Sequence, residues 1–192
     1  MRKKRDEVSY YPEIMDFLKN QIESNFRSSK KPLKVYCKTG ELRKGLHEII
    51  DENRLEIESI KRFADKTPPL SLDIFGIITD GDDYQLLIVE VKDLKSVGLQ
   101  QLSQLVGYCI VSRSEYGILM NVDGGESRRL TDLINTDKDL LTINQKMSSD
   151  ETIIHQLGVM QWDSMTKNIT YSGTGNIGSI SKLCASIAEK FV

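Results

Sequence analysis

Three charged residues, Asp73, Glu90 and Lys92, stand out in the sequence because they interrupt two runs of apolar residues. The first run covers residues 70–79 and the second covers residues 84–92. Carboxylate oxygens are the ligands that Mg²⁺ and Mn²⁺ prefer, and a lysine beside them can position or activate a water molecule. These residue types could therefore hold a divalent cation and hydrolyse a phosphate ester, provided that the fold brings them together.

The segment between the two runs has the sequence DGDD, which is typical of the turn of a β-hairpin. A hairpin with this turn places Thr79 opposite Tyr84, and the same register places Asp73 opposite Glu90. Cβ atoms of directly opposed residues lie about 4.5–5.5 Å apart, so the two carboxylates would repel each other unless a cation lies between them. Side chains alternate along a strand, so Lys92 shares a face with Glu90 and is close enough to join them.

Asp73 followed by Glu90-x-Lys92 resembles the motif of the PD-(D/E)xK nucleases, whose fold is that of the restriction endonucleases. Leu72 stands where the family motif has its proline. The resemblance implies that Asp73 and Glu90 hold the metal with help from the backbone carbonyl of Val91, and that Lys92 positions or activates the attacking water. A charge ladder on an exposed sheet face is the alternative, and the aliphatic residues of the same strand argue against it.

A helix is expected after the hairpin, with Ser96 as its N-cap and an apolar stripe along one side. The stripe consists of Leu99, Leu102, Val106, Cys109 and Ile110. Gln104 and Tyr108 lie on another side of this helix and form the pattern QxxxY. The pattern resembles the one with which many PD-(D/E)xK nucleases contact DNA near the metal, and an ordinary polar helix face is the alternative.

The next segment, YGILMN at residues 116–121, predicts a buried strand. A strand–helix–strand connection is normally right-handed with parallel strands, so this strand should join the sheet of the hairpin. The expected fold class is α/β: a restriction-endonuclease-like mixed β-sheet with an antiparallel hairpin and a parallel crossover strand, flanked by helices. Residues 1–122 would form the nuclease core, and residues 123–192 a C-terminal β/α extension packed on it within one compact domain.

Three further residues are candidates for completing the metal site. Glu7 precedes a Tyr-Pro pair, which resembles the opening helix of several PD-(D/E)xK families, where such an acid reaches the metal or its water. Glu13 lies on the same predicted helix, and an exposed glutamate that favours the helix dipole is the alternative for both. His47 lies on a helix that Thr39 could cap, in an order that resembles the RecB-like branch, and a solvated surface histidine is the alternative.

Contact with DNA is predicted from local positive charge, because a net charge of −2 is not that of a general DNA binder. Residues 27–44 contain a single acid, Glu41, among seven cations: Arg27, Lys30, Lys31, Lys34, Lys38, Arg43 and Lys44. This segment is the main candidate for contact with the phosphate backbone, and a solvated basic loop is the alternative. The basic residues 1–5 are expected to form a solvated tail, with phosphate contact as the alternative.

The glycine-rich segment 173–178, GTGNIG, matches the dinucleotide-binding fingerprint by its letters alone. That fingerprint needs a following strand with an acid about 20 residues on, and no such strand follows here. A turn that leads into a helix is therefore expected, with phosphate binding at the helix N-terminus as the minor alternative.

The composition of the 192-residue chain, with 39% hydrophobic and 28% charged residues, is that of a globular domain. No apolar run approaches a membrane span, so an intracellular, cytoplasmic protein without membrane contact is expected. The three scattered cysteines are too few for an iron–sulfur cluster with four cysteine ligands, and they do not favour a disulfide scaffold or a zinc cluster.

Together with the resemblance, these features predict a Mg²⁺- or Mn²⁺-dependent nuclease that hydrolyses the phosphodiester bonds of DNA. A nuclease specific for junctions or flaps is one alternative, and a non-catalytic DNA-binding or assembly subunit with the same fold is the other. A homodimer is expected because one site cuts one strand, and a domain of this size has room for one site.

Overall fold

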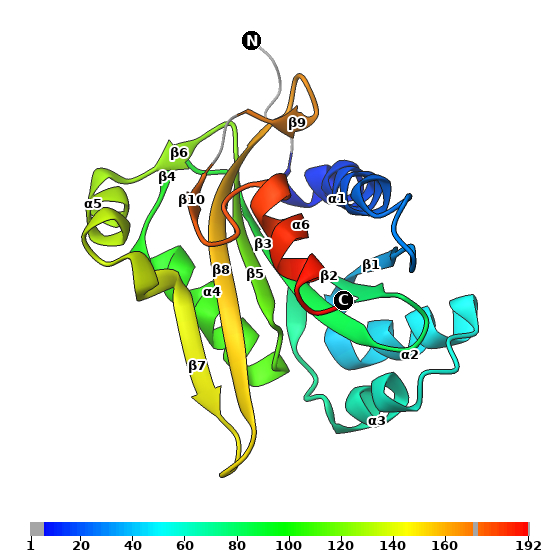
Figure 1. Cartoon of the computed structure of the whole chain (residues 1–192). Helices are drawn as coiled ribbons and strands as arrows, with labels where there is room; N and C mark the ends of the chain where they lie inside the picture. The colour runs from blue at the N-terminus through cyan, green and yellow to red at the C-terminus, as the bar shows by residue number, and fades with distance from the viewer. Residues whose placement is uncertain (1–5, 171–172, 192) are drawn as a thin grey trace.

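A mixed eight-stranded β-sheet runs through the molecule and carries helices on both faces (Figure 1). The structure, a computed structural model, describes residues 6–170 and 173–191. The strands of this sheet are β1 (Lys34–Glu41), β2 (Ser71–Thr79), β3 (Tyr84–Lys92), β5 (Tyr116–Val122), β7 (Thr142–Lys146), β8 (Thr152–Asp163), β9 (Asn168–Ile169) and β10 (Thr174–Gly175). Two further strands, β4 (Ser96–Val97) and β6 (Gly125–Glu126), form a separate parallel pair.

The sheet is covered by six α-helices and two short 3-10 helices in the described ranges. The α-helices are α1 (Tyr11–Asn25), α2 (Leu42–Asn53), α3 (Glu58–Lys66), α4 (Leu99–Ser112), α5 (Arg128–Thr136) and α6 (Ile180–Ala188), and the 3-10 helices are η1 (Glu7–Tyr10) and η2 (Lys138–Leu141). Helix α6 lies in front of the sheet and α4 behind it in the view of Figure 1. None of the helices in the described part of the chain is long and apolar enough to cross a membrane.

The predicted hairpin and crossover are both confirmed. Strands β2 and β3 pair antiparallel from Thr79–Tyr84 to Ile74–Val89, in the register that the sequence predicted. Strand β5 pairs parallel to β3, and α4 connects the two. The fold is therefore α/β with a mixed sheet flanked by helices.

Each face of the sheet has its own apolar core. Helices α1 and α6 cover one face, where Trp162 and Tyr116 are among the largest fully buried side chains. Helices α2 to α5 cover the other face, where Phe75 of β2 is fully buried. Side chains alternate along each strand, so neighbouring residues of β2 and β3 enter opposite cores and fasten both helix layers to the same hairpin.

The C-terminal part of the chain belongs to the sheet and is not a separate layer on it. Strand β8 pairs with β5 along the whole length of β5 and also carries β7, β9 and β10. Helix α6 then returns across the sheet and packs against the core that α1 covers. Residues 1–122 therefore supply β1, β2, β3 and β5, and the other strands of this sheet come from the C-terminal part of the chain.

Two predicted helix caps are wrong. Ser96 lies in β4, and α4 begins after Gly98, whose N–H donates to Gln101 Oε1 at 3.0 Å. Thr39 lies in β1, and the cap of α2 is Glu41, whose side chain accepts from the N–H of Lys44 at 3.3 Å. In both cases the expected cap lies within a strand that pairs with another strand distant in sequence.

Two helical glycines offer a test of how closely α2 packs against β2. A Cβ atom at Gly45 of α2 would overlap the ring of Phe75, whereas one at Gly107 of α4 would meet nothing within 4 Å. Gly45→Ala should lower the free energy of unfolding by about 1–3 kcal/mol through overpacking. Gly107→Ala should raise it by up to about 1 kcal/mol, because alanine favours the helix. Urea denaturation of both variants measures the difference, and equal effects would contradict the close approach of α2 to β2.

Candidate functional site

Three carboxylates surround one ammonium group at the C-terminal end of β3, which is an inner strand of the sheet. Lys92 Nζ lies 2.5 Å from Glu90 Oε1, 3.6 Å from Asp73 Oδ2 and 4.0 Å from Glu7 Oε1. Glu7 comes from η1, Asp73 from β2, and Glu90 and Lys92 from β3. The structure thus brings together four of the predicted site residues, and we call Glu7, Asp73, Glu90 and Lys92 the carboxylate–lysine cluster.

Asp73 lies where the pairing between β1 and β2 changes register. Lys38 pairs with Phe75, but Gly40 pairs with Leu72, so two steps along β1 match three steps along β2. Such irregularities re-aim the side chains of a strand. The ladder with β3 ends one pair before Asp73, and the side chain of Asp73 is turned toward the end of β3.

Both carboxylate oxygens of Asp73 accept hydrogen bonds. The hydroxyl of Tyr11 donates to Oδ1 at 2.7 Å, and the backbone N–H of Val91 donates to Oδ2 at 2.9 Å. Burial, followed by the hydrogen bond to Asp73, raises the pKa of Tyr11 far above its ordinary range, so this hydroxyl stays a donor. Asp73 is therefore fixed in position from β3 and from α1.

Tyr11 is a site residue that the sequence argument missed. In the sequence the Tyr-Pro pair only marks the acid before it, and residue types alone do not tell that a tyrosine reaches an aspartate 62 residues away. The same tyrosine also lies 3.5 Å from Glu7 Oε1, so one hydroxyl links two acids of the cluster.

Glu7 joins the cluster and Glu13 does not. Glu7 Oε2 accepts from the N–H of Asp93 at 3.1 Å, which ties η1 to the residue that follows Lys92. Glu13 instead forms an ion pair with Lys167 at 3.1 Å, next to β9. The structure thus favours Glu7 over Glu13 as the third acid of the cluster.

Glu90 is the most buried acid of the cluster, with only 1% of its side chain exposed. Burial raises its pKa from the ordinary value of 4.5 to about 7, and the charges of Asp73 and Glu7 act in the same direction while Lys92 opposes them. Burial also lowers the pKa of Lys92, but the carboxylates outweigh it and the net shift is upward. Lys92 is therefore an ammonium at neutral pH, and Glu90 keeps its proton to a higher pH than an exposed glutamate does.

The donor set of the cluster fits a small hard cation. Mg²⁺ usually binds to one or two carboxylates and keeps waters or phosphate oxygens as its other ligands. Asp73 and Glu90 supply two such carboxylates, and both lie beside the ammonium of Lys92. No set of three His, Cys, Asp or Glu side chains that could hold a metal ion occurs within residues 6–170 and 173–191. Val91 contacts the cluster through its N–H, and a role for its carbonyl stays a prediction.

Gln104 and Tyr108 interact with each other on the outer side of α4. Gln104 Nε2 donates to the hydroxyl of Tyr108 at 2.9 Å. In the part of the chain that the structure describes, neither side chain makes a hydrogen bond or ion pair with the cluster. Their contact with DNA stays a prediction.

The predicted basic surface is partly neutralised by acids of the same chain. Lys31 forms ion pairs with Asp80 and Asp82 at 3.2 and 2.8 Å. Lys38 does so with Glu48 and Glu52 at 3.3 and 2.8 Å. These two lysines, at least, are engaged within the chain, which weakens the case for residues 27–44 as a phosphate-binding segment.

The remaining candidates lie in ordinary structural settings. His47 is a surface residue of α2 whose Nε2 lies 3.5 Å from Asp65 Oδ1. Gly173 and Gly178 close a turn in which the N–H of Gly173 donates to the carbonyl of Gly178 at 2.7 Å, and α6 follows. The predicted tail, residues 1–5, lies outside the described residues.

Comparisons of the chain with models of known protein families, with curated proteins and with solved structures find no match. The resemblance to the PD-(D/E)xK nucleases therefore rests on the residues of the cluster and on their geometry.

The buried acid predicts how stability depends on pH. The folded chain holds the proton of Glu90 up to about pH 7, whereas the unfolded chain loses it near pH 4.5. The free energy of unfolding should therefore fall as pH rises through this window, by on the order of 1–3 kcal/mol. Glu90→Gln removes the ionisable group and should flatten the fall. Urea denaturation of the wild type and of Glu90→Gln at pH 5 and pH 8 measures the fall in the free energy of unfolding. An equal fall in both proteins would show that the pKa of Glu90 is not raised by folding.

Proposed function

We propose that this chain is a divalent-metal-dependent nuclease with a restriction-endonuclease-like fold, which hydrolyses the phosphodiester bonds of DNA at the carboxylate–lysine cluster. The observation that carries the proposal is the convergence of three acids, from η1, β2 and β3, within 4.0 Å of the ammonium of Lys92. Surface charge ladders do not bury a glutamate or fix both oxygens of an aspartate. This arrangement therefore supports a reactive site over a solvated row of charges.

Each residue of the cluster has a defined task in the proposed reaction. Asp73 and Glu90, with the carbonyl of Val91, would hold Mg²⁺ or Mn²⁺. When bound, the metal supplies positive charge to the phosphate and lowers the pKa of a coordinated water. Lys92 orients the attacking water and offsets the negative charge that develops on the phosphate. Glu7 keeps Lys92 and the backbone of Asp93 in place.

The proposal includes the partners of the reaction. DNA is the substrate, and Gln104 and Tyr108 hold it from the outer side of α4. A second copy of the chain would allow both strands of a duplex to be cut, since each copy carries one cluster. We place the proposed reaction in an intracellular, cytoplasmic setting.

Lys92→Met tests the reaction itself. The variant keeps the aliphatic stem but loses the ammonium, so metal-dependent nicking of a plasmid should fall by at least about a hundredfold. Lys31→Met is the matched control, because Lys31 also contacts two carboxylates, Asp80 and Asp82, but these belong to the turn at the other end of the hairpin. Circular dichroism in the presence of Mg²⁺ verifies that both variants are folded. Wild-type nicking rates in Lys92→Met would refute the nuclease assignment.

The same assay separates the kinds of nuclease. A panel of linear duplex, single strand, flap and four-way junction shows which substrate is cut fastest. A clear preference for the flap or the junction would identify a structure-specific enzyme. Binding of these DNAs without any cleavage in Mg²⁺ or Mn²⁺ would identify a non-catalytic subunit.

Asp73→Asn tests the metal ligands. Loss of one negative charge from a two-carboxylate site should weaken Mg²⁺ or Mn²⁺ binding at least about tenfold, as titration calorimetry measures. Asp80→Asn is the control, because Asp80 belongs to the same hairpin but pairs with Lys31. Equal metal affinity in Asp73→Asn and the wild type would place the metal elsewhere.

A further inference from the structure

A basic cleft of about 350 Å³ lies between α3 and the last turn of α4. Arg62 and Lys66 of α3 and Arg113, which follows α4, contribute three cations to its lining. Phe63 and Val111 add apolar surface between them, and the lining contains no carboxylate. The carboxylate–lysine cluster contributes none of its residues to this cleft.

The cations of the cleft have no acidic partner, in contrast to several other lysines of the chain. Lys31, Lys38 and Lys92 each contact two or more carboxylates. Arg62, Lys66 and Arg113 form no ion pair with any residue in the ranges 6–170 and 173–191. Three exposed cations around one cleft are therefore available to an anion.

Two of these cations also repel each other. Arg62 and Lys66 are four residues apart on α3, so their side chains lie on the same side of the helix, and like charges at this spacing destabilise a helix. Lys66 lies in the last turn of α3, where a cation is favourable for the helix dipole, but Arg62 lies at the middle of the helix. An anion bound between the two would remove the repulsion.

The apolar part of the cleft narrows the choice of anion. The ring of Phe63 packs against that of Tyr84, with centroids 5.8 Å apart. Val111 is 51% exposed, which is unusual for an aliphatic side chain of this protein. Cations beside exposed apolar surface match a phosphate that is attached to a sugar and a base, because phosphate binds the charged groups while the rest contacts the carbon atoms.

We propose that this cleft is a phosphate-binding site, and that it holds a backbone phosphate of the nucleic acid that reaches the carboxylate–lysine cluster. The second half of this statement rests on the proposed nuclease function. Helix α4 connects the parallel strands β3 and β5, so it begins near the end of β3 that carries the cluster and ends at the cleft. Gln104, Tyr108 and Val111 follow one another along its outer side at helical spacing.

The length of α4 gives an estimate of the distance between the two sites. Its 14 residues span about 21 Å at 1.5 Å per residue. Phosphates of one strand are spaced about 3.4 Å apart along a duplex axis, so the cleft would receive a phosphate about six nucleotides from the bond that is cut. The substrate must therefore extend this far on one side of the cleavage point.

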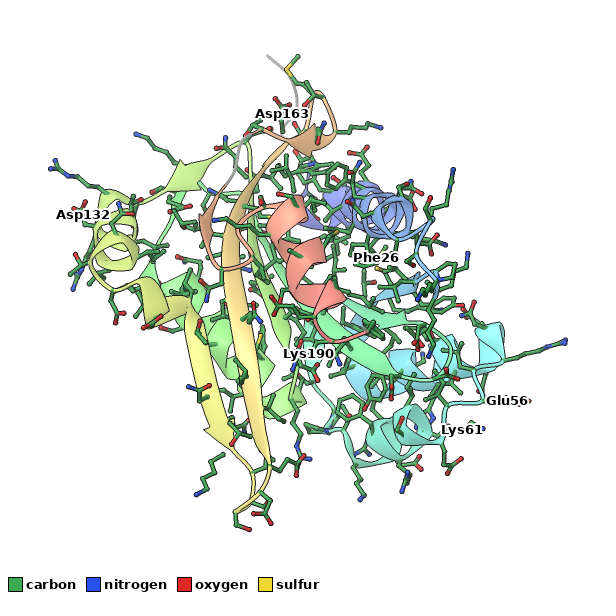
Figure 2. All side chains as sticks on the ribbon, in the orientation of Figure 1. Phe26, Glu56, Lys61, Asp132, Asp163 and Lys190 are labelled. Carbon is green, nitrogen blue, oxygen red and sulfur yellow. The ribbon has the colours of Figure 1, made fainter. Side chains whose placement is uncertain are left out.

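Arg62→Ala tests the cleft, with Lys61→Ala as its matched control. Lys61 is the neighbouring cation on α3, extends into solvent (Figure 2) and does not line the cleft. Binding of a fluorescent DNA duplex, long enough to span both sites, is measured by anisotropy with Ca²⁺ in place of Mg²⁺. Arg62→Ala should weaken binding on the order of tenfold and reduce the salt dependence by about one phosphate contact. Lys61→Ala should change the affinity less than about twofold.

Equal duplex affinities of the two variants would overturn the proposal. Inorganic phosphate and a free mononucleotide serve as competitors, to identify the source of the phosphate. If they bind in an Arg62-dependent manner while duplex affinity does not depend on Arg62, the ligand is a small phosphate compound, and the assignment to nucleic acid is refuted.

These experiments distinguish failure of the cleft proposal from failure of the nuclease proposal. Cleavage by the wild-type protein, together with unchanged duplex binding in Arg62→Ala, would refute the cleft and leave the nuclease standing. Arg62-dependent duplex binding by a wild-type protein that cuts no DNA would refute the nuclease and leave the cleft standing. Urea denaturation of both alanine variants verifies that the comparison is made between equally folded proteins.

Discussion

The ammonium group of Lys92 balances the negative charge of three carboxylates, which come from three different elements of the fold. Removing one partner of a buried ion pair is strongly destabilising, because the charge that remains has lost its hydration. Lys92 is the cation that Glu7, Asp73 and Glu90 share. Since Glu90 is buried, this ammonium offsets the repulsion among the acids that η1, β2 and β3 bring together.

Hydrogen bonds from elements outside the hairpin hold the cluster in place. Tyr11 reaches Asp73 from α1, whose apolar side belongs to the core that α6 also covers. On the neighbouring strand Asn121, paired in register with Lys92, donates to the carbonyls of Leu94 and Gly125 at 3.0 and 2.9 Å. The side-chain carbonyl of Asn121 accepts from the N–H of Leu94 at 3.2 Å, so both backbone polar groups of Leu94, in the loop after Lys92, bind to Asn121.

The parts of the fold that depend on local pattern could be predicted from the sequence. The turn between the apolar runs set the register of β2 and β3, and the segment 116–121 was recognised as the strand parallel to β3. Contacts between distant residues could not be predicted: Tyr11 on Asp73, the clamp made by Asn121, and the pairing of β4 with β6 that moves the start of α4 to Leu99. These depend on how whole elements pack, and neither periodicity nor residue type contains that information.

The most direct measurement is the stability of Lys92→Met in the absence and presence of Mg²⁺, beside the wild type and Lys31→Met. Without metal, the loss of the shared ammonium should lower the free energy of unfolding by on the order of 3–5 kcal/mol. Mg²⁺ should restore more stability to Lys92→Met than to the wild type, because the metal then replaces a missing charge. Lys31→Met, which removes an ammonium that is itself exposed and pairs with the exposed Asp82, should lose less than about 1 kcal/mol and should not respond to Mg²⁺ more than the wild type does. A Lys92→Met protein as stable as the wild type, or one that Mg²⁺ stabilises no more, would contradict the account of a cation-dependent cluster.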